Sequence, residues 1–109
     1  MSNAELPYIC FVTAPSREVA LTLAKDIVEA GLAACVNCVP AVESVYQWQG
    51  EINIDTEVLM VIKTEKRLID ALKETIIAEH PYEVPEFIAL AVSDISPDYA
   101  NWLSSNLRK

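Results

Sequence analysis

Two long β-rich segments that meet at one turn signal constrain this chain more than any other feature of its sequence. Residues 33–49 and 51–63 are rich in β-branched and aromatic side chains, and Gln49-Gly50 separates them. Apolar residues alternate along the second segment, so the pattern predicts a β-hairpin with two long strands. Pro40 interrupts the first segment. We expect a bulge or a sheet edge there, because proline has no N–H to donate to a neighbouring strand.

The length of this hairpin has a consequence for packing. A strand over residues 51–63 extends roughly 40 Å at about 3.3 Å per residue, whereas a compact domain of this size has a radius of gyration of about 13 Å. The hairpin is therefore predicted to project beyond the core and to expose Tyr46, Trp48, Ile52 and Ile54. Exposed apolar surface and open strand edges are typical of protein interfaces, so we expect an obligate oligomer. The alternative is a short hairpin with a disordered tip.

The segments around the hairpin complete an alternating order of elements. We predict a strand over residues 8–14, a helix that opens at Pro15-Ser16 and ends before Gly31, a second helix over residues 64–80, a strand over residues 86–92 and a short helix from Ser96-Pro97 onward. Thr64 is the predicted N-cap of the second helix, and Pro81 ends that helix at His80. The order β-α-β-β-α-β plus a C-terminal helix predicts an α+β, ferredoxin-like split β-α-β fold with an antiparallel sheet.

Bulk properties narrow the class of protein. The 109 residues fit a single domain, residues 1–109, in which residues 1–5 are expected to be disordered or derived from an expression tag. The formal charge of -8 argues against a nucleic-acid partner, and no apolar run is long enough for a membrane span. No secretion signal is recognisable. Three cysteines, an odd number, predict reduced thiols and a cytoplasmic protein.

The cysteines offer little chemistry. Cys35 and Cys38 form a C-x-x-C pair at the start of a predicted strand, where residues three apart point to opposite faces of the sheet. Redox pairs of this type sit instead at a helix N-terminus. No second pair completes a zinc site. We interpret these two residues, and Cys10 in the first strand, as small packing residues.

The single histidine, His80, is the strongest candidate for chemistry. It lies at a predicted helix C-terminus, where the helix dipole favours a positive imidazole, and Glu79, Glu83 and Glu86 are close in sequence. Imidazole with carboxylates is a plausible ligand set for copper or zinc. The alternative is that His80 only ends the helix, within an ordinary charged surface.

Other side chains leave two interpretations open. Lys63 ends a long apolar strand, either as an edge lysine that reaches water or as a cation in a cleft. The aromatic residues Tyr46, Trp48, Tyr82 and Trp102 either line a pocket or anchor an interface.

No Ser or Cys has a base at a spacing typical of a nucleophile, and two isolated glycines do not form a phosphate-binding loop. We therefore predict that the protein is not an enzyme.

Several blocks of the sequence, in chain order, resemble the CutA family of divalent-cation tolerance proteins. They run over nearly the whole chain and comprise TAP at residues 13–15, GLAACVN, SVYQWQGEI, Glu57, IKT at residues 62–64, HPYEVPE at residues 80–86 and the closing DYANW. The resemblance implies a ferredoxin-like protomer in a tight cytosolic homotrimer, with strands shared between subunits through the hairpin. It implies a role in the response to copper or other divalent metals. The alternative is a sensor like the PII signalling proteins, with a small ligand between subunits and an unknown protein partner.

The resemblance carries over only part of a copper site. The family's copper pattern uses a cysteine just before the TAP motif and a histidine pair before the proline. This sequence has Val12 at the cysteine position and Glu79-His80 in place of the pair, so only His80 matches. The resemblance therefore implies at most a weak site for copper or another divalent cation, with His80 and a carboxylate such as Glu79 as ligands.

The resemblance also implies a cleft between subunits that His80 faces. Side chains from neighbouring chains are expected to line it, namely Lys63, Glu57, Trp48, Tyr82 and Glu86. An acid, a lysine and a histidine in one recess suit a small anionic or zwitterionic ligand as well as a metal.

Overall fold

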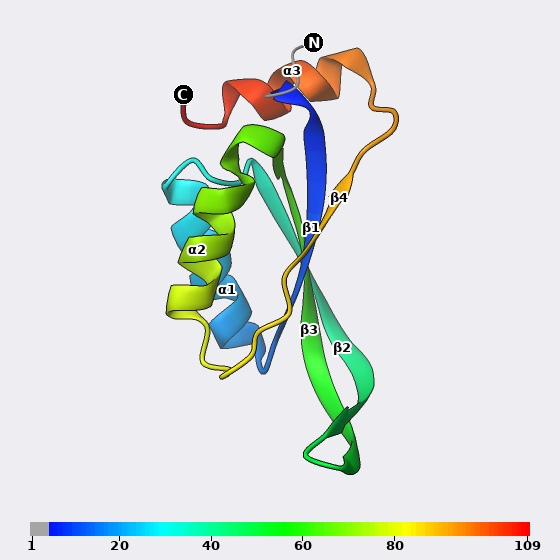
Figure 1. The fold of residues 1–109 in the computed structure, drawn as a ribbon. Helices are drawn as coiled ribbons and strands as arrows, with labels where there is room; N and C mark the ends of the chain where they lie inside the picture. The colour runs from blue at the N-terminus through cyan, green and yellow to red at the C-terminus, as the bar shows by residue number, and fades with distance from the viewer. Residues whose placement is uncertain (1–4) are drawn as a thin grey trace.

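The computed structural model describes residues 5–109, and the expectation for residues 1–4 lies outside this part. The elements follow the predicted order (Figure 1). They are β1 (Pro7–Ala14), α1 (Arg17–Glu29), β2 (Cys35–Trp48), β3 (Glu51–Glu65), the 3-10 turn η2 (Lys66–Leu68), α2 (Ile69–Glu79), β4 (Ile88–Ala91) and α3 (Pro97–Ser105). The fold is α+β, as predicted. No helix among the described residues combines the length and apolar character that crossing a bilayer requires.

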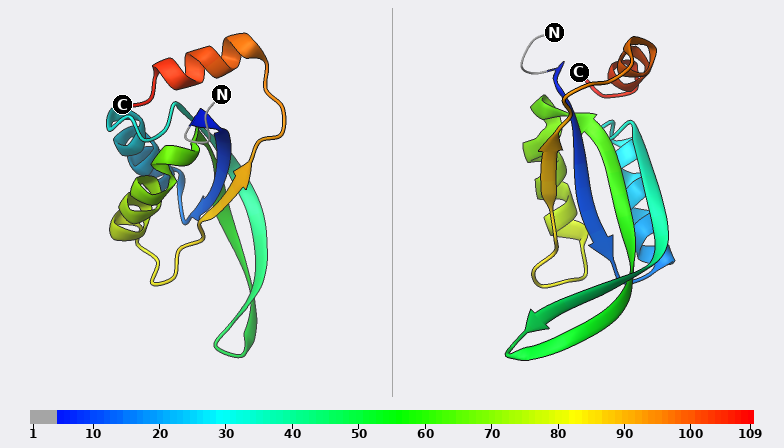
Figure 2. Two further views of the ribbon diagram at one scale, coloured as in Figure 1. Left: turned by 45° about the horizontal axis from the view of Figure 1, so that its top comes forward. Right: turned by 90° about the vertical axis from the view of Figure 1, so that its right-hand side faces the viewer.

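The four strands form one antiparallel sheet in the order β2-β3-β1-β4. β3 therefore lies between β1 and β2, and the connection through α1 passes over it. Both α1 and α2 cover the same face of the sheet, and α3 lies across the end of the sheet where β1 begins (Figures 1 and 2). Within residues 5–109, no helix lies over the opposite face of the sheet.

The core lies between the sheet and the two helices. On β3, side chains at alternate positions are buried, as the period of two requires, and β1 contributes a matching row. These residues pack against the buried stripes of α1 and α2, and the main members are Cys10, Val12, Met60, Ile62, Ile27, Leu72 and Ile76.

The face without helices also carries apolar side chains. Ile88 and Leu90 on β4 pair with Phe11 and Ile9 on β1. These positions alternate with the buried residues of β1, so their side chains lie on the face without helices. Ile88 and Leu90 both remain close to half exposed, at 48% and 46%. This face therefore exposes apolar side chains that no helix of residues 5–109 covers.

The hairpin of β2 and β3 is long, as predicted, and the alternative of a short hairpin with a disordered tip is wrong. Trp48 pairs with Glu51 across a two-residue turn, in which Gln49 and Gly50 have φ of 51° and 81°. Positive φ at both positions is typical of a type I′ turn. The described chain measures 45 × 26 × 22 Å, and the hairpin tip projects well beyond the helices (Figure 2). We call residues 42–57 the arm.

A bulge separates the arm from the rest of the hairpin, close to the predicted position at Pro40. The pairing shifts between Val39 and Val42, so that two residues of β2 stand opposite one residue of β3. Ala41 takes up the irregularity with φ of 59°. Beyond the bulge, the even-numbered residues of β2 lie on the sheet face that the odd-numbered ones occupy before it.

The end of α1 confirms the role predicted for Gly31. Its φ is +70°, its N–H donates to the carbonyl of Val28, and the N–H of Leu32 donates to that of Ile27. These two bonds form a Schellman motif, in which glycine supplies the left-handed conformation. At the other end, the Ser16 hydroxyl accepts from the N–H of Val19 as an N-cap.

The prediction that Thr64 caps the second helix is wrong. Thr64 is the next-to-last residue of β3, pairs with Tyr8 and is fully buried. Its hydroxyl donates to the carbonyl of Leu32 at 2.7 Å, so tertiary contacts on both sides extend the strand. Instead, α2 follows directly after the 3-10 turn η2. The last strand is shorter than predicted, since only four residues pair with β1.

Candidate functional site

A recess lies where the arm meets the segment after α2. It has a volume of about 390 Å³ and is lined by Thr13, Ser44, Val45, Tyr46, Trp48, Glu57, Tyr82, Val84 and Glu86. We call it the arm recess. It brings together four of the five residues predicted to line a cleft, all except Lys63.

The bulge and the chain after α2 position these side chains. Because the bulge shifts the register of β2, Tyr46 and Trp48 share a face of the arm with Glu57. Pro81 ends α2 and leads the chain back beneath this face, where the Tyr82 hydroxyl donates to Glu57 Oε2 at 2.6 Å. Glu57 is only 7% exposed. The contact holds the buried carboxylate in place across the recess.

Burial and the nearby carboxylates raise the pKa of several side chains in and beside the recess. Partial burial and the charge of Glu57 raise the pKa of Glu86 above its usual value of 4.5. Burial, and then the hydrogen bond to Glu57, raise the pKa of Tyr82. On the outer side of the arm recess, Tyr46 donates its hydroxyl to the carboxylate of Asp55, and this bond raises the Tyr46 pKa. The recess is therefore a strongly acidic environment.

His80 is buried behind the recess and is held at both ring nitrogens. The N–H of Tyr82 donates to Nδ1 at 3.0 Å, so Nδ1 is the acceptor and Nε2 carries the proton. Nε2 then donates to the carbonyl of Thr13 at 2.7 Å. The ring is neutral in this arrangement. It ends the helix, as predicted, and it fastens the chain after α2 to the end of β1.

These contacts do not fit a metal site within one chain. With both His80 nitrogens engaged, a metal ion would have to replace one of the two hydrogen bonds. The Glu79 side chain turns toward Asp26 on α1, and the hydrogen bond between them raises the Glu79 pKa. Among the described residues, no group of three or more His, Cys, Asp and Glu side chains is arranged to hold a metal ion. The ligand role of His80 and Glu79 stays a prediction.

Lys63 lies far from the arm recess in the same chain. It is six residues after Glu57 on β3, which corresponds to about 20 Å along the strand. Its Nζ contacts Asn37 Oδ1, and Cys35 Sγ at 3.8 Å. Lys63 borders another recess, of about 400 Å³, beside Asp94 and Tyr99. It would have to join the predicted cleft from a neighbouring chain.

The cysteines behave as packing residues. Cys35 pairs with Lys63 on the open face, and Cys38 pairs with Met60 on the covered face, so the two thiols lie on opposite sides of the sheet, as predicted. All three cysteines are free. Burial raises the pKa of Cys10 to about 12.

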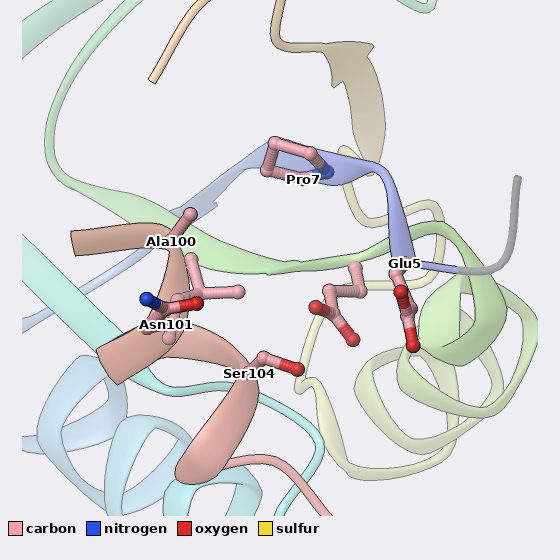
Figure 3. A pocket seen from close by; sticks show the side chains of 7 residues that line it. Glu5, Pro7, Ala100, Asn101 and Ser104 are labelled. Carbon is pink, nitrogen blue, oxygen red and sulfur yellow. The ribbon is translucent and has the colours of Figure 1, made fainter. Parts of the chain in front are cut away.

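Further recesses lie away from the predicted residues. One is formed where α3 crosses the ends of β1 and β3 (Figure 3), with Glu5, Pro7, Ala100, Asn101 and Ser104 around it. Trp102, which we had grouped with the other aromatic residues, lies on α3, its ring centroid 5.5 Å from that of Tyr99. Ser44 and Val84 also line the arm recess, and no local signal in the sequence distinguishes them.

Comparison with known proteins gives a consistent result. The family model described as "CutA1 divalent ion tolerance protein" matches residues 8–106. The divalent-cation tolerance protein CutA of Thermus thermophilus is 47% identical over 98 residues, which cover 90% of this chain and 95% of that protein. The chloroplastic CutA of Arabidopsis thaliana is 46% identical over 92% of this chain, which spans 55% of that protein.

A solved structure agrees over the full fold. The crystal structure of CutA1 from Oryza sativa superimposes with a TM-score of 0.94 at 42% identity, and the match covers 99% of each chain. The agreement includes the long hairpin, since almost no residue of either chain is left out. The strand order, the projecting arm and these matches together show that the chain belongs to the CutA1 divalent ion tolerance family.

Proposed function

We propose that this protein acts in divalent-cation tolerance as a ferredoxin-like homotrimer, in which the arm of one chain packs on the next and the arm recess becomes a ligand-binding cleft between chains. The observation that carries the proposal is the apolar surface that one chain leaves open. The number three comes from the family resemblance, and the geometry supports contact between copies of the chain.

Two apolar surfaces support self-association. On the arm, Val45, Ile52 and Ile54 share one face and are 66%, 69% and 66% exposed. On the sheet, the face that carries Ile88 and Leu90 has no helix over it. β2 and β4 are the two edges of the sheet, so unlike edges of neighbouring copies are free to meet. Contacts of this head-to-tail kind form a ring when the rotation between neighbouring copies closes.

The arm recess supports ligand binding more directly than metal binding. Its walls combine aromatic rings with two carboxylates, as in many small-molecule sites. This observation favours the PII-like sensor function, in which a small ligand binds in the cleft between chains. That function is compatible with the proposed assembly. Copper binding through His80 and Glu79 is less well supported, because both His80 nitrogens already have partners.

The cytoplasm is the proposed location. The three free cysteines support it, because reduced thiols persist in that compartment. The Arabidopsis relative is named as chloroplastic, so other compartments are in use among similar proteins.

Native mass spectrometry of the protein and of the double variant Ile52→Asp, Ile54→Asp tests the assembly. We expect a trimer for the wild type and dissociated, folded chains for the variant, since two charges would enter an apolar contact. Ile77→Asp is the matched control, because Ile77 is 53% exposed on α2 and lies outside the arm. A wild-type protein that remains monomeric at micromolar concentration would contradict the proposal.

A further inference from the structure

The arm recess carries negative charge without an opposite charge. Glu57 and Glu86 both line it, and no lysine or arginine is among its nine lining residues. The ion pairs of residues 5–109 are Arg67–Glu65 and Lys73–Asp70, and neither involves the recess. His80, just behind it, is held as the neutral ring by its Nδ1 acceptor role.

A buried carboxylate without a cation is costly. Glu57 is 7% exposed and has the Tyr82 hydroxyl as its hydrogen-bond donor, but a neutral donor does not cancel the charge. Glu86, on the exposed rim, lines the same recess, and partial burial together with the charge of Glu57 raises its pKa. Buried charges in proteins are usually paired. A cation from outside the chain would supply the pairing that the recess lacks among residues 5–109.

The rest of the lining indicates what kind of cation fits. Tyr46, Trp48 and Tyr82 present aromatic surface to the same recess, and Tyr46 and Trp48 are 41% and 44% exposed. Aromatic faces attract ammonium and guanidinium groups, most strongly in the case of tryptophan. A bare metal ion would use the carboxylates and leave these rings without a function. A small organic cation would contact both the carboxylates and the aromatic rings.

We propose that the arm recess binds the ammonium or guanidinium group of a small organic cation, seated between the carboxylates of Glu57 and Glu86 and the rings of Tyr46, Trp48 and Tyr82. This inference rests on the proposed function only in that it names the ligand class of the same cleft. It differs from the anionic or zwitterionic ligand that the sequence first suggested, because no lysine or arginine of the same chain lines the recess.

The experiment compares three probes of nearly equal shape that differ in charge, namely phenethylammonium, phenethyl alcohol and phenylacetate. The chain has two tryptophans, so the variant Trp102→Phe leaves Trp48 as the only indole reporter of binding. We expect phenethylammonium to change the Trp48 fluorescence in a saturable manner, and to bind at least about tenfold more tightly than the alcohol or the acid, as charge-assisted contacts require.

Three variants assign the effect to the carboxylates. Glu86→Gln on the rim and Glu57→Gln, which keeps an acceptor for Tyr82, are each expected to weaken phenethylammonium binding about tenfold. Glu43→Gln is the matched control, because Glu43 is an exposed acid on the opposite face of the arm, and it should leave binding unchanged.

Two results would overturn the inference. One is tighter binding of phenylacetate or phenethyl alcohol than of phenethylammonium. The other is absence of phenethylammonium binding to the wild-type assembly, as expected if Lys63 of a neighbouring chain supplies the positive charge. Both results can be told apart from the outcome of the assembly test. A trimer that prefers phenylacetate would support the proposed function and contradict this inference. A monomer that binds phenethylammonium would support this inference and contradict the proposed assembly.

Discussion

The two halves of the long hairpin have the same backbone and opposite surroundings. Near the helices, Val58, Met60 and Ile62 of β3 are at most 6% exposed. On the arm, Ile52 and Ile54 of the same strand are 69% and 66% exposed. The pairing with β2 is continuous through both halves apart from the bulge. The difference shows that strand formation here depends on local pairing and the turn, whereas burial depends on what lies over the strand.

The contrast also separates two kinds of stabilisation. The inner half is covered by elements of its own chain, so its packing belongs to the free energy of folding of one protomer. The outer half makes its apolar contacts, in our proposal, with another copy. Substitutions in the two halves should therefore respond differently to protein concentration.

The largest expected effect comes from paired isoleucine truncations in the two halves. Ile62→Ala should lower the free energy of unfolding by about 2–5 kcal/mol at every protein concentration, because it leaves a cavity in the core. Ile54→Ala should act mainly through assembly, so its effect on the melting temperature should grow as the protein is diluted. Thermal unfolding of both variants over a range of concentrations measures this. A concentration-independent loss of equal size for Ile54→Ala would show that the arm packs within its own chain.

A smaller contrast is expected between the two glycines with positive φ, Gly31 at the end of α1 and Gly50 at the tip of the arm. A Cβ on Gly31 would lie 2.8 Å from Arg108 Cβ and 2.9 Å from the Arg108 backbone nitrogen, whereas one on Gly50 meets nothing within 4 Å. Gly50→Ala should therefore cost only the conformational strain, about 1–2 kcal/mol. Gly31→Ala should cost more, about 2–4 kcal/mol, because the C-terminal segment must also move. Chemical denaturation measures both, and equal losses would show that the close approach of Arg108 is unimportant.

The smallest expected effect is a pH dependence of stability that comes from Glu86, where the arm meets the rest of the chain. The Glu86 pKa is raised in the folded protein relative to its usual 4.5. The neutral form is therefore favoured by folding, and this contribution to stability is complete below about pH 4.5 and is lost as the pH rises through the raised value. Glu86→Gln does not ionise, so it should be slightly more stable than the wild type at neutral pH. The difference in melting temperature should vanish below pH 4.5, and a constant difference at all pH values would argue against this cause.

Much of the fold followed from local signals in the sequence. The turn at Gln49-Gly50, the bulge near Pro40 and the left-handed Gly31 each depend on the backbone preferences of one or two residues, and each is confirmed. Thr64 was misassigned for the opposite reason. Its sequence context suits a helix cap, but its pairing with Tyr8 and its bond to the Leu32 carbonyl come from distant parts of the chain.

The candidate site shows the same division. The motif around His80 contributes Tyr82 and Glu86 to the arm recess, where four of the five predicted cleft residues meet. The contact of His80 with Thr13 joins residues 67 positions apart, so no local pattern could indicate that both ring nitrogens are engaged. The resemblance implies that Lys63 joins Glu57 from a neighbouring chain, and this stays a prediction; within one chain, six positions along β3 separate the two residues.

The bulge at residues 40–41 limits how the arm of such a protein can change in length. Removing one residue there would exchange the two sides of β2 beyond it, turning Val45 toward Tyr82 and the indole of Trp48 away. Adding two residues to each strand near the tip would lengthen the reach and keep every side chain on its present side. Longer and shorter arms are thus compatible with the same recess only when the strands grow in steps of two.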